Sequence, residues 1–261
     1  SPKNLNVSNK THKNLLNNLR DKRIFQIYRK FEKILSLNKD FIVGVSGGPD
    51  SLALCFLTKI YSIKKSLNAY YYIVDHRLRK NSSTEAQSVK NLLKKNNIKS
   101  DILNWYGKKP TSNIQSLARN KRYSLLIIQA KKLNIKNILT GHHIDDLFEN
   151  FFIRISRGSG LNGLVSFREK TQRDKVNILR PLLSFEKKDL NYVTSKVFKF
   201  FVKDPSNENN TFKRTRIRKL IKNLQNDGLD KNKFLLTIKN LSYSNETIKF
   251  YVAKNLTDNS Y

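Results

Sequence analysis

The chain has 261 residues and carries 51 lysines and arginines against 20 aspartates and glutamates, a formal net charge of +31. Its hydrophobic content of 38% suffices for a folded core and excludes a disordered polycation. A single cysteine, Cys55, excludes a disulfide framework and a cysteine-based zinc site. No run of about 18 apolar residues occurs, and residues 1–20 lack the apolar stretch of a secretory signal. We therefore expect a cytoplasmic protein without a membrane span.

The positive charge predicts a polyanionic partner, of which nucleic acid is the commonest, although codon drift in an AT-rich genome would raise the total similarly. Its distribution is more informative. Three segments lack lysine and arginine: 40–58, 66–76 and 137–153. They hold acids and three of the four histidines: Asp50, Asp75, His76, His142, His143, Asp145, Asp146 and Glu149. Apolar strands exclude lysine but do not explain these acids, so we interpret them as a functional cluster.

In chain order, strands and helices alternate. After a polar leader and a helix within 1–37, short apolar runs predict strands at 41–45, 70–74, 99–104 and 136–140. Helical spacing predicts helices at 52–63, 83–96, 112–134 and 144–156. This alternation predicts an α/β fold with a doubly wound, mainly parallel sheet, helices on both faces, and a site at the carboxyl ends of the strands.

The last third of the chain is less regular. The expected elements are a glycine-rich loop at 158–164, an edge strand at 177–180, a helix at 184–197 with Ser184 as N-cap, a turn at 204–207, a very basic helix at 214–224 and further helix at 228–261. We predict three parts: a leader and helix at 1–37, an α/β domain at 38–212, and the basic helix with the start of a truncated helical domain at 213–261.

The turn at 46–51 is the strongest local motif. Its sequence, Ser46-Gly47-Gly48-Pro49-Asp50-Ser51, joins an apolar strand to a helix. The glycines allow close approach of the backbone to an anion, and the helix directs its positive end toward it. Neither the Walker pattern nor the Gly-x-Gly-x-x-Gly pattern is present. The motif resembles the pyrophosphatase loop of the N-type ATP pyrophosphatases, which implies that 38–212 is such a domain and that the loop binds ATP.

Further motifs indicate which family within this superfamily the chain resembles. They lie at 74–79, 113–123, 140–149, 154–164 and 204–207, with arginines following the last. In this order they are similar to the tRNA(Ile)-lysidine synthetases over about 40–220. Leu147 and Asn150 replace a glutamine and a threonine usual in that family. The resemblance implies ATP-dependent ligation of free L-lysine to C2 of the wobble cytidine of tRNA(Ile) with anticodon CAU, through an adenylated cytidine.

Each step of that reaction has candidate residues. Asp50 and Asp146 are candidates for holding Mg²⁺, which prefers carboxylate and phosphate oxygens. Asp145 or Asp146, with Glu149, offers negative charge to the substrate lysine. The α-phosphate and proton-transfer candidates are Arg119, Arg122, His142 and His143. The remaining substrate-binding candidates are Asp75, His76, Arg154, Arg157, Arg214, Arg216 and Arg218, of which the arginines would contact tRNA phosphates.

Other interpretations of these residues stay open. The His-His-x-Asp-Asp run fits a zinc or iron site, and Glu149 fits an ion pair with Arg154 or Arg157. The basic helix would also suit a solvated surface. We expect Tyr123 and Cys55 to be core residues.

Rival functions include a tRNA-thiolating enzyme of the same superfamily, which the single cysteine disfavours. A small-molecule amidating synthetase would not need the charge, and a non-catalytic tRNA-binding protein would not need the acids. A homodimer is compatible with the sequence.

Overall fold

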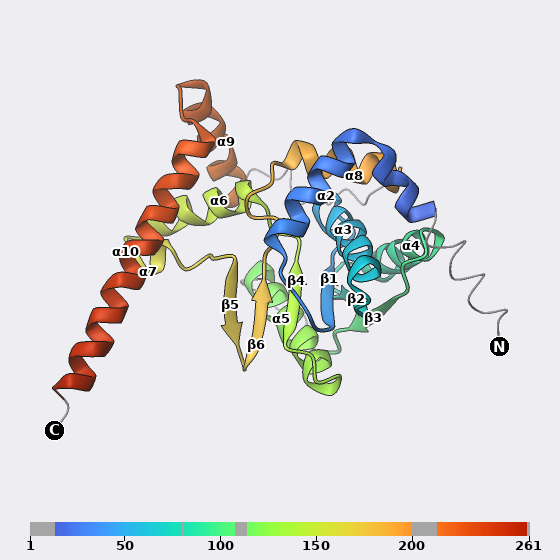
Figure 1. The fold of residues 1–261 in the computed structure, drawn as a ribbon, viewed down its shortest axis with the longest axis horizontal. Helices are drawn as coiled ribbons and strands as arrows, with labels where there is room; N and C mark the ends of the chain where they lie inside the picture. The colour runs from blue at the N-terminus through green and yellow to red at the C-terminus, as the bar shows by residue number, and fades with distance from the viewer. Residues whose placement is uncertain (1–13, 80, 108–113, 200–212, 260–261) are drawn as a thin grey trace. The chain divides into compact units, whose positions relative to one another are not determined.

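The computed structural model describes residues 14–79, 81–107, 114–199 and 213–259 (Figure 1). The turn expected at 204–207 and the first part of the polar leader lie outside these ranges. By contact the chain divides into two compact units. The first comprises Ser1–His143 and Glu169–Asp204, and the second comprises Ile144–Arg168 and Pro205–Tyr261.

The first unit is built on a six-stranded sheet. Its strands are β1 (Phe41–Val45), β2 (Ala69–Asp75), β3 (Ser100–Asn104), β4 (Asn137–Thr140), β5 (Lys170–Arg173) and β6 (Val176–Leu179). The order across the sheet is β3-β2-β1-β4-β6-β5. All neighbours are parallel except β5 and β6. The predicted doubly wound, mainly parallel sheet is therefore confirmed.

Helices cover both faces of this sheet, as predicted. They are α2 (Lys22–Ile34), α3 (Pro49–Lys65), α4 (Ser82–Lys95), α5 (Ile114–Lys132) and α8 (Lys187–Val197), with a short 3-10 helix η1 (Asn18–Arg20) before α2. Side chains of α2, α3, α4 and α8 form one core cluster, and α5 packs on the other face. Gly44 of β1 permits the close approach of α5, since a Cβ there would lie 2.9 Å from a methyl carbon of Leu126.

Two sequence expectations in this unit are wrong. The segment at 177–180 is not an edge strand, because β6 pairs with β4 on one side and β5 on the other. The edge is β5, whose polar sequence and exposed side chains carry no apolar alternation. Ser184 is not the N-cap of α8, which begins at Lys187 after Glu186. The carbonyl of Ser184 instead accepts a hydrogen bond from Lys30 Nζ at 2.6 Å.

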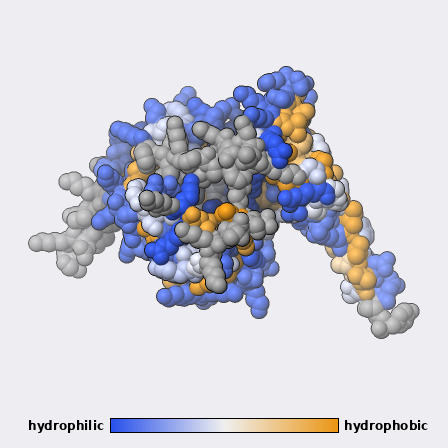
Figure 2. Space-filling model, turned by 180° about the vertical axis from the view of Figure 1, so that it is seen from behind, coloured by the Kyte–Doolittle hydropathy of each residue, from blue (hydrophilic) through white to orange (hydrophobic). Residues whose placement is uncertain are grey.

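The second unit is helical within its described residues. It contains α6 (Ile144–Ile155), the short α7 (Leu161–Leu164) within the expected glycine-rich loop, α9 (Lys213–Asn226) and α10 (Lys231–Asp258). Its apolar contacts join distant segments: the ring of Phe234 in α10 packs within 5.4 Å of the rings of Phe148, Phe151 and Phe152. Apolar side chains stay exposed along the last turns of α10, among them Ile248, Val252 and Leu256 (orange on the long helix in Figure 2).

The part of the chain that the structure describes contains no helix both long and apolar enough to cross a membrane.

Candidate functional site

Chemistry-bearing residues follow four neighbouring parallel strands of the first unit. The 46–51 loop follows β1, and Asp75 and His76 lie at the end of β2. The turn at 140–143 begins with the last residue of β4, and Arg180 follows β6. Because the carboxyl ends of parallel strands share one edge of a sheet, these residues gather along that edge.

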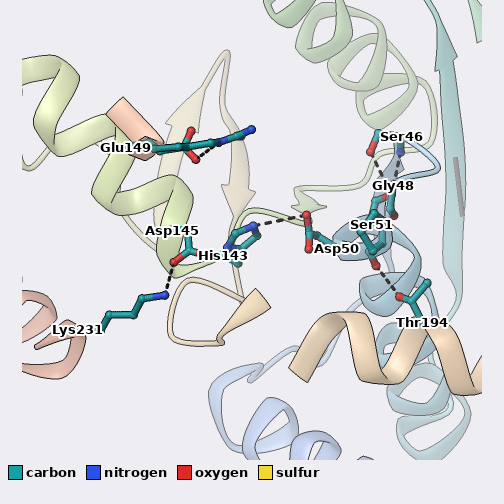
Figure 3. Close-up of polar contacts among 11 residues, drawn as sticks. Ser46, Gly48, Asp50, Ser51, His143, Asp145, Glu149, Thr194 and Lys231 are labelled. Carbon is teal, nitrogen blue, oxygen red and sulfur yellow. Dashed lines mark hydrogen bonds and ion pairs between the residues drawn. The ribbon is translucent and has the colours of Figure 1, made fainter. Parts of the chain in front are cut away.

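The 46–51 loop is held by its own serines. Ser51 Oγ donates to the carbonyl of Gly48 at 2.9 Å and accepts from the backbone N–H of Ser46 at 3.2 Å (Figure 3). Gly47 has a φ of 82°, a conformation that favours glycine. Gly48 is the N-cap of α3 and provides no side-chain cap. No side chain therefore caps the first amides of α3, and an anion at this end of the helix would accept from them.

Two other segments fix the loop from outside. Thr194 Oγ1 of α8 donates to the carbonyl of Pro49 at 2.7 Å. Gly141 lies against the first turn of α3, where a Cβ would be 3.0 Å from the backbone N and Cα of Ser51. Because those atoms are backbone, only glycine fits without a shift of the loop. The turn after β4 and the 46–51 loop thus pack directly against each other.

Asp50 and His143 come together beside this loop. Asp50 Oδ2 lies 3.5 Å from His143 Nε2, whose ring is buried (Figure 3). The other oxygen, Oδ1, is buried and has no hydrogen-bond partner among the described residues. On the neighbouring His142, Nδ1 lies 3.0 Å from Thr140 Oγ1. Asp50 therefore presents an unsatisfied acceptor, which a cation or a donor group on a ligand would satisfy.

Asp75 is an internal brace. Its side chain is 2% exposed, and its two oxygens accept from the backbone N–H of Arg77 at 2.9 Å and from Ser83 Oγ at 2.6 Å. Burial opposes ionisation, but these hydrogen bonds outweigh it and lower the pKa of Asp75 from its usual value. Both oxygens are engaged, so Asp75 orders the segment after β2 rather than offering a vacant acceptor.

His76 is neutral at physiological pH. Burial, with a smaller contribution from Arg122, lowers the pKa of His76 from 6.5 to about 4. Its Nε2 lies 3.5 Å from Arg122 Nη2. Since a guanidinium only donates, we assign the ring proton to Nδ1. That nitrogen is buried without a hydrogen-bond partner among the described residues, so it is a donor available to a ligand.

The pKa of His76 predicts a pH dependence of stability. The unfolded chain binds a proton below pH 6.5 but the folded chain only below about 4, so stability is present above 6.5 and is lost as pH falls toward 4. In His76→Asn, which cannot titrate, we expect this loss to shrink by on the order of 1–2 kcal/mol. Denaturant unfolding at pH 7 and pH 4.5 measures it. An equal loss in both proteins would contradict the assignment of a neutral His76.

Arg119 and Tyr123 form a cation–π pair on α5, with the guanidinium carbon 5.6 Å from the ring centroid. Tyr123 is buried, as predicted, and so is Cys55. Sequence reasoning missed Arg180, which is only 6% exposed. The available signal was a basic residue directly after an apolar strand, since Asp75 ends β2 and His142 lies two residues after β4.

Glu149 of α6 lies in the second unit and is buried there. One oxygen lies 2.5 Å from Arg218 Nε of α9, and the other, Oε2, has no hydrogen-bond partner within the described ranges. Burial raises the pKa of Glu149 above its usual value, although Arg218 acts in the opposite direction. The ion-pair partner of Glu149 is therefore Arg218 and not Arg154 or Arg157.

Asp145, in the first turn of α6, accepts from Lys231 Nζ at 2.8 Å (Figure 3). Lys231 is the first residue of α10, so this contact and the Glu149–Arg218 pair join α6 to α9 and α10. Arg214 and Arg216 of α9 are exposed, as is Arg157, and Arg154 is half-buried.

The predicted metal sites stay predictions. Among the described residues no group of three or more His, Cys, Asp or Glu side chains is arranged to hold a metal ion. The structure pairs Asp50 with His143 in the first unit and places Asp146 in the second. Joint magnesium binding by Asp50 and Asp146 therefore stays a prediction.

A glycine-containing loop between β1 and α3, at the carboxyl edge of a mainly parallel sheet, is typical of nucleotide-binding α/β proteins. The chain matches the family model of the PP-loop domain over residues 18–224 and belongs to that ATP-binding family.

Its curated relatives include tRNA(Ile)-lysidine synthases. The one from Orientia tsutsugamushi is 39% identical over 188 residues, which cover 72% of this chain and 42% of the relative. The one from Rhodopseudomonas palustris is 39% identical over 191 residues, covering 72% and 55%. The chain spans about half the length of the curated relatives it matches.

A solved structure also shares the fold. It is the U34-tRNA thiolase NcsA from Methanococcus maripaludis with its [4Fe-4S] cluster, at a TM-score of 0.73 and 17% identity, over 84% of this chain and 78% of that one. At this identity the likeness shows the fold alone.

Proposed function

We propose that the chain ligates L-lysine to C2 of the wobble cytidine of tRNA(Ile) with anticodon CAU, using ATP. The observation that carries this proposal is the serine-braced loop at the N-terminus of α3, with Asp50 and His143 beside it, in a chain 39% identical to tRNA(Ile)-lysidine synthases. The loop supplies the donors that a pyrophosphate leaving group requires.

The proposed reaction has two steps. The C2 oxygen of cytidine attacks the α-phosphorus of ATP, a P–O bond forms, and pyrophosphate leaves. The ε-amine of lysine then attacks C2, AMP leaves with the former C2 oxygen, and the amine loses a proton to a base. Arg119 and Arg122 would stabilise charge at the α-phosphate, and His142 or His143 would carry the proton. Neutral His76 would donate Nδ1–H to bound substrate.

Magnesium fits this site through Asp50. Its buried, unsatisfied Oδ1 is the kind of hard oxygen ligand that Mg²⁺ accepts alongside phosphate oxygens, with Asp146 as the second candidate from sequence. When bound, the ion would offset the negative charge of the triphosphate.

The substrate lysine would be recognised by the acids of α6. Asp145, Asp146 and Glu149 supply negative charge for its ammonium group, and Glu149 Oε2 is a buried acceptor without a partner among the described residues. Asp145 already binds one lysine ammonium, that of Lys231, at 2.8 Å. The substrate carries the same group, so this contact supports a role for Asp145 in binding it.

The deciding experiment measures release of AMP and pyrophosphate from ATP with tRNA(Ile) bearing CAU. The proposal expects pyrophosphate release to require tRNA, and AMP release to require both tRNA and lysine, with lysine incorporated into the tRNA. AMP release that ignores lysine would contradict it. The alternative, thiolation of tRNA, is tested by adding a sulfur donor and measuring sulfur incorporated into the tRNA. Cys55 disfavours it, because the thiol is fully buried and burial raises its pKa.

For tRNA binding we expect Arg214 and Arg216 to matter. Both are exposed on α9, whereas Arg218 is held by Glu149. Replacing both with glutamate should weaken tRNA binding and reduce the slope of log K against log salt by about 1 for each phosphate that is no longer neutralised. A salt titration of tRNA affinity tests this. Lys94→Glu with Lys95→Glu on α4 is the control with the same change of net charge, and an equal effect there would mean that only total charge counts.

A further inference from the structure

An exposed aromatic residue lies at the carboxyl edge of the sheet, beyond the residues described so far. Tyr106 follows β3 and is 76% exposed. The guanidinium carbon of Arg77, which follows β2, lies 5.0 Å from the centroid of its ring. Most of Tyr106 is therefore open to solvent, with a cation against its ring. Aromatic rings and arginine guanidiniums are the surfaces on which unpaired bases stack in RNA-binding proteins.

Asp75 fixes both sides of this pair. Its Oδ1 accepts from the backbone N–H of Arg77 at 2.9 Å, and its backbone carbonyl accepts from the N–H of Trp105 at 2.9 Å. Arg77 has a φ of 52°, which is uncommon for a residue other than glycine. Such a conformation persists where surrounding contacts impose it, and it is frequent at binding sites. One buried residue thus orders the backbone segments that carry Arg77 and Tyr106.

Trp105, the neighbouring ring, is less open than Tyr106. It is half-buried, and a Cβ on Gly107 would lie 2.7 Å from its Nε1, so the indole lies close to the backbone of Gly107. Trp105 is also the only tryptophan in the chain. Its fluorescence therefore reports on the surroundings of Tyr106 alone.

Tyr106 is within reach of the 46–51 loop. In the sheet β3 pairs with β2, and β2 pairs with β1, which leads into that loop. Neighbouring strands are about 4.8 Å apart, so the end of β3 lies about 10 Å along the edge from the end of β1. Neighbouring nucleotides of an unstacked RNA strand span such a distance. A base beside a cytidine held at the loop can therefore reach Tyr106.

We infer that Tyr106, with Arg77 against its ring, is a stacking platform for an unpaired base that flanks the wobble cytidine in the tRNA anticodon loop. The inference deepens the proposed function and rests on it. A base that undergoes chemistry leaves its stack, and the base beside it then loses a stacking neighbour. Tyr106 replaces that neighbour, and Arg77 adds a positive charge near the RNA backbone. Because every base has a π-face, the platform holds the loop without reading its sequence.

Matched losses in the protein and in the RNA test the inference. We would measure the Kd for the anticodon stem-loop of tRNA(Ile) with CAU, and for the same RNA with an abasic nucleotide on either side of the wobble cytidine in turn. Tyr106→Ala is expected to raise the Kd about five- to 150-fold, the range for one lost base–aromatic stack. One abasic RNA should bind the wild type equally weakly, and Tyr106→Ala should lose nothing further with it. Multiplicative losses with both abasic RNAs would overturn the inference.

Two further variants separate stacking from other effects. Tyr106→Phe keeps the ring and should bind the stem-loop as the wild type does. Phe25→Ala is the matched control, because Phe25 is another exposed ring of the same unit, on α2. It should leave the Kd unchanged. A loss in Tyr106→Phe or in Phe25→Ala as large as that in Tyr106→Ala would overturn the inference. The slope of log K against log salt should stay the same in Tyr106→Ala, since no phosphate contact is lost.

Trp105 fluorescence gives a second readout. The stem-loop should quench it in the wild type and quench it less in Tyr106→Ala at saturating RNA, and equal quenching would contradict the platform. The Kd for ATP should be the same in both proteins. If Tyr106→Ala weakens binding of ATP and not of RNA, the ring holds the adenine of ATP and the inference fails.

None of these measurements needs lysine, so the inference and the proposed function fail separately. Coupling between Tyr106 and one abasic RNA, without lysine-dependent AMP release, would support the platform and contradict the proposed function. Lysine-dependent AMP release with full RNA affinity in Tyr106→Ala would do the reverse. A wild-type chain that does not bind the stem-loop would overturn both.

Discussion

Asp50→Asn is expected to reduce lysine- and tRNA-dependent AMP release by at least about 10²–10³-fold, the scale for removing one electrostatic interaction with the reacting group. The asparagine keeps the size and shape of the side chain but removes the charge that a cation on ATP requires. Folding should change little, because an acid in the first turn of a helix contributes only about 0.3–1 kcal/mol. Steady-state kinetics and thermal melting measure the two quantities.

Asp40→Asn is the matched control for this prediction. Asp40 lies in the same unit, just before β1, and accepts from the backbone N–H and the side-chain amide of Asn68 at 2.8 and 2.9 Å. We expect it to lose about 1 kcal/mol of stability and to keep its activity. Near wild-type turnover of Asp50→Asn would contradict a role for Asp50 in the site. So would a loss of stability large enough to unfold the variant and thereby account for its lost activity.

The regular elements of the sheet were predictable because their signals are local. Strands such as Phe41–Val45 are buried on both faces and contain only apolar residues and one glycine, and the helix after the 46–51 loop follows a proline at its first turn. The edge strand Lys170–Arg173 was not predictable, because an exposed edge needs no apolar pattern. Its pairing with Val176–Leu179 comes from the turn at Asp174 and Lys175, both at positive φ.

Partners of the candidate acids were not predictable from spacing along a helix. That rule proposed Arg154 and Arg157 for Glu149, but the observed partner, Arg218, is 69 residues away. Asp145 and Lys231 are 86 residues apart. Such contacts depend on how α9 and α10 pack on α6. For α10 this packing includes the contact of Phe234 with Phe148. Residue types therefore indicate the chemistry, whereas tertiary packing decides which charges meet.

Arg218→Met is expected to destabilise the folded chain by about 3 kcal/mol at neutral pH, because it leaves the buried Glu149 carboxylate without its counter-charge. The pH dependence has a definite sign. A carboxyl group with a raised pKa in the folded state binds its proton more tightly there, so its contribution to stability decreases as pH rises above 4.5. Without Arg218 this effect grows, and the loss should be larger at pH 8 than at pH 5. Denaturant unfolding at both values measures it.

The double variant Glu149→Gln with Arg218→Met separates an uncompensated charge from lost packing. Glutamine removes the charge while keeping the shape, so the double variant should regain most of the stability lost by Arg218→Met. It should also lose the difference between pH 5 and pH 8, since no group at position 149 titrates. If the double variant is as unstable as Arg218→Met, the arginine acts by packing its methylene groups between α6 and α9, and the charge of Glu149 has no part in holding these helices together.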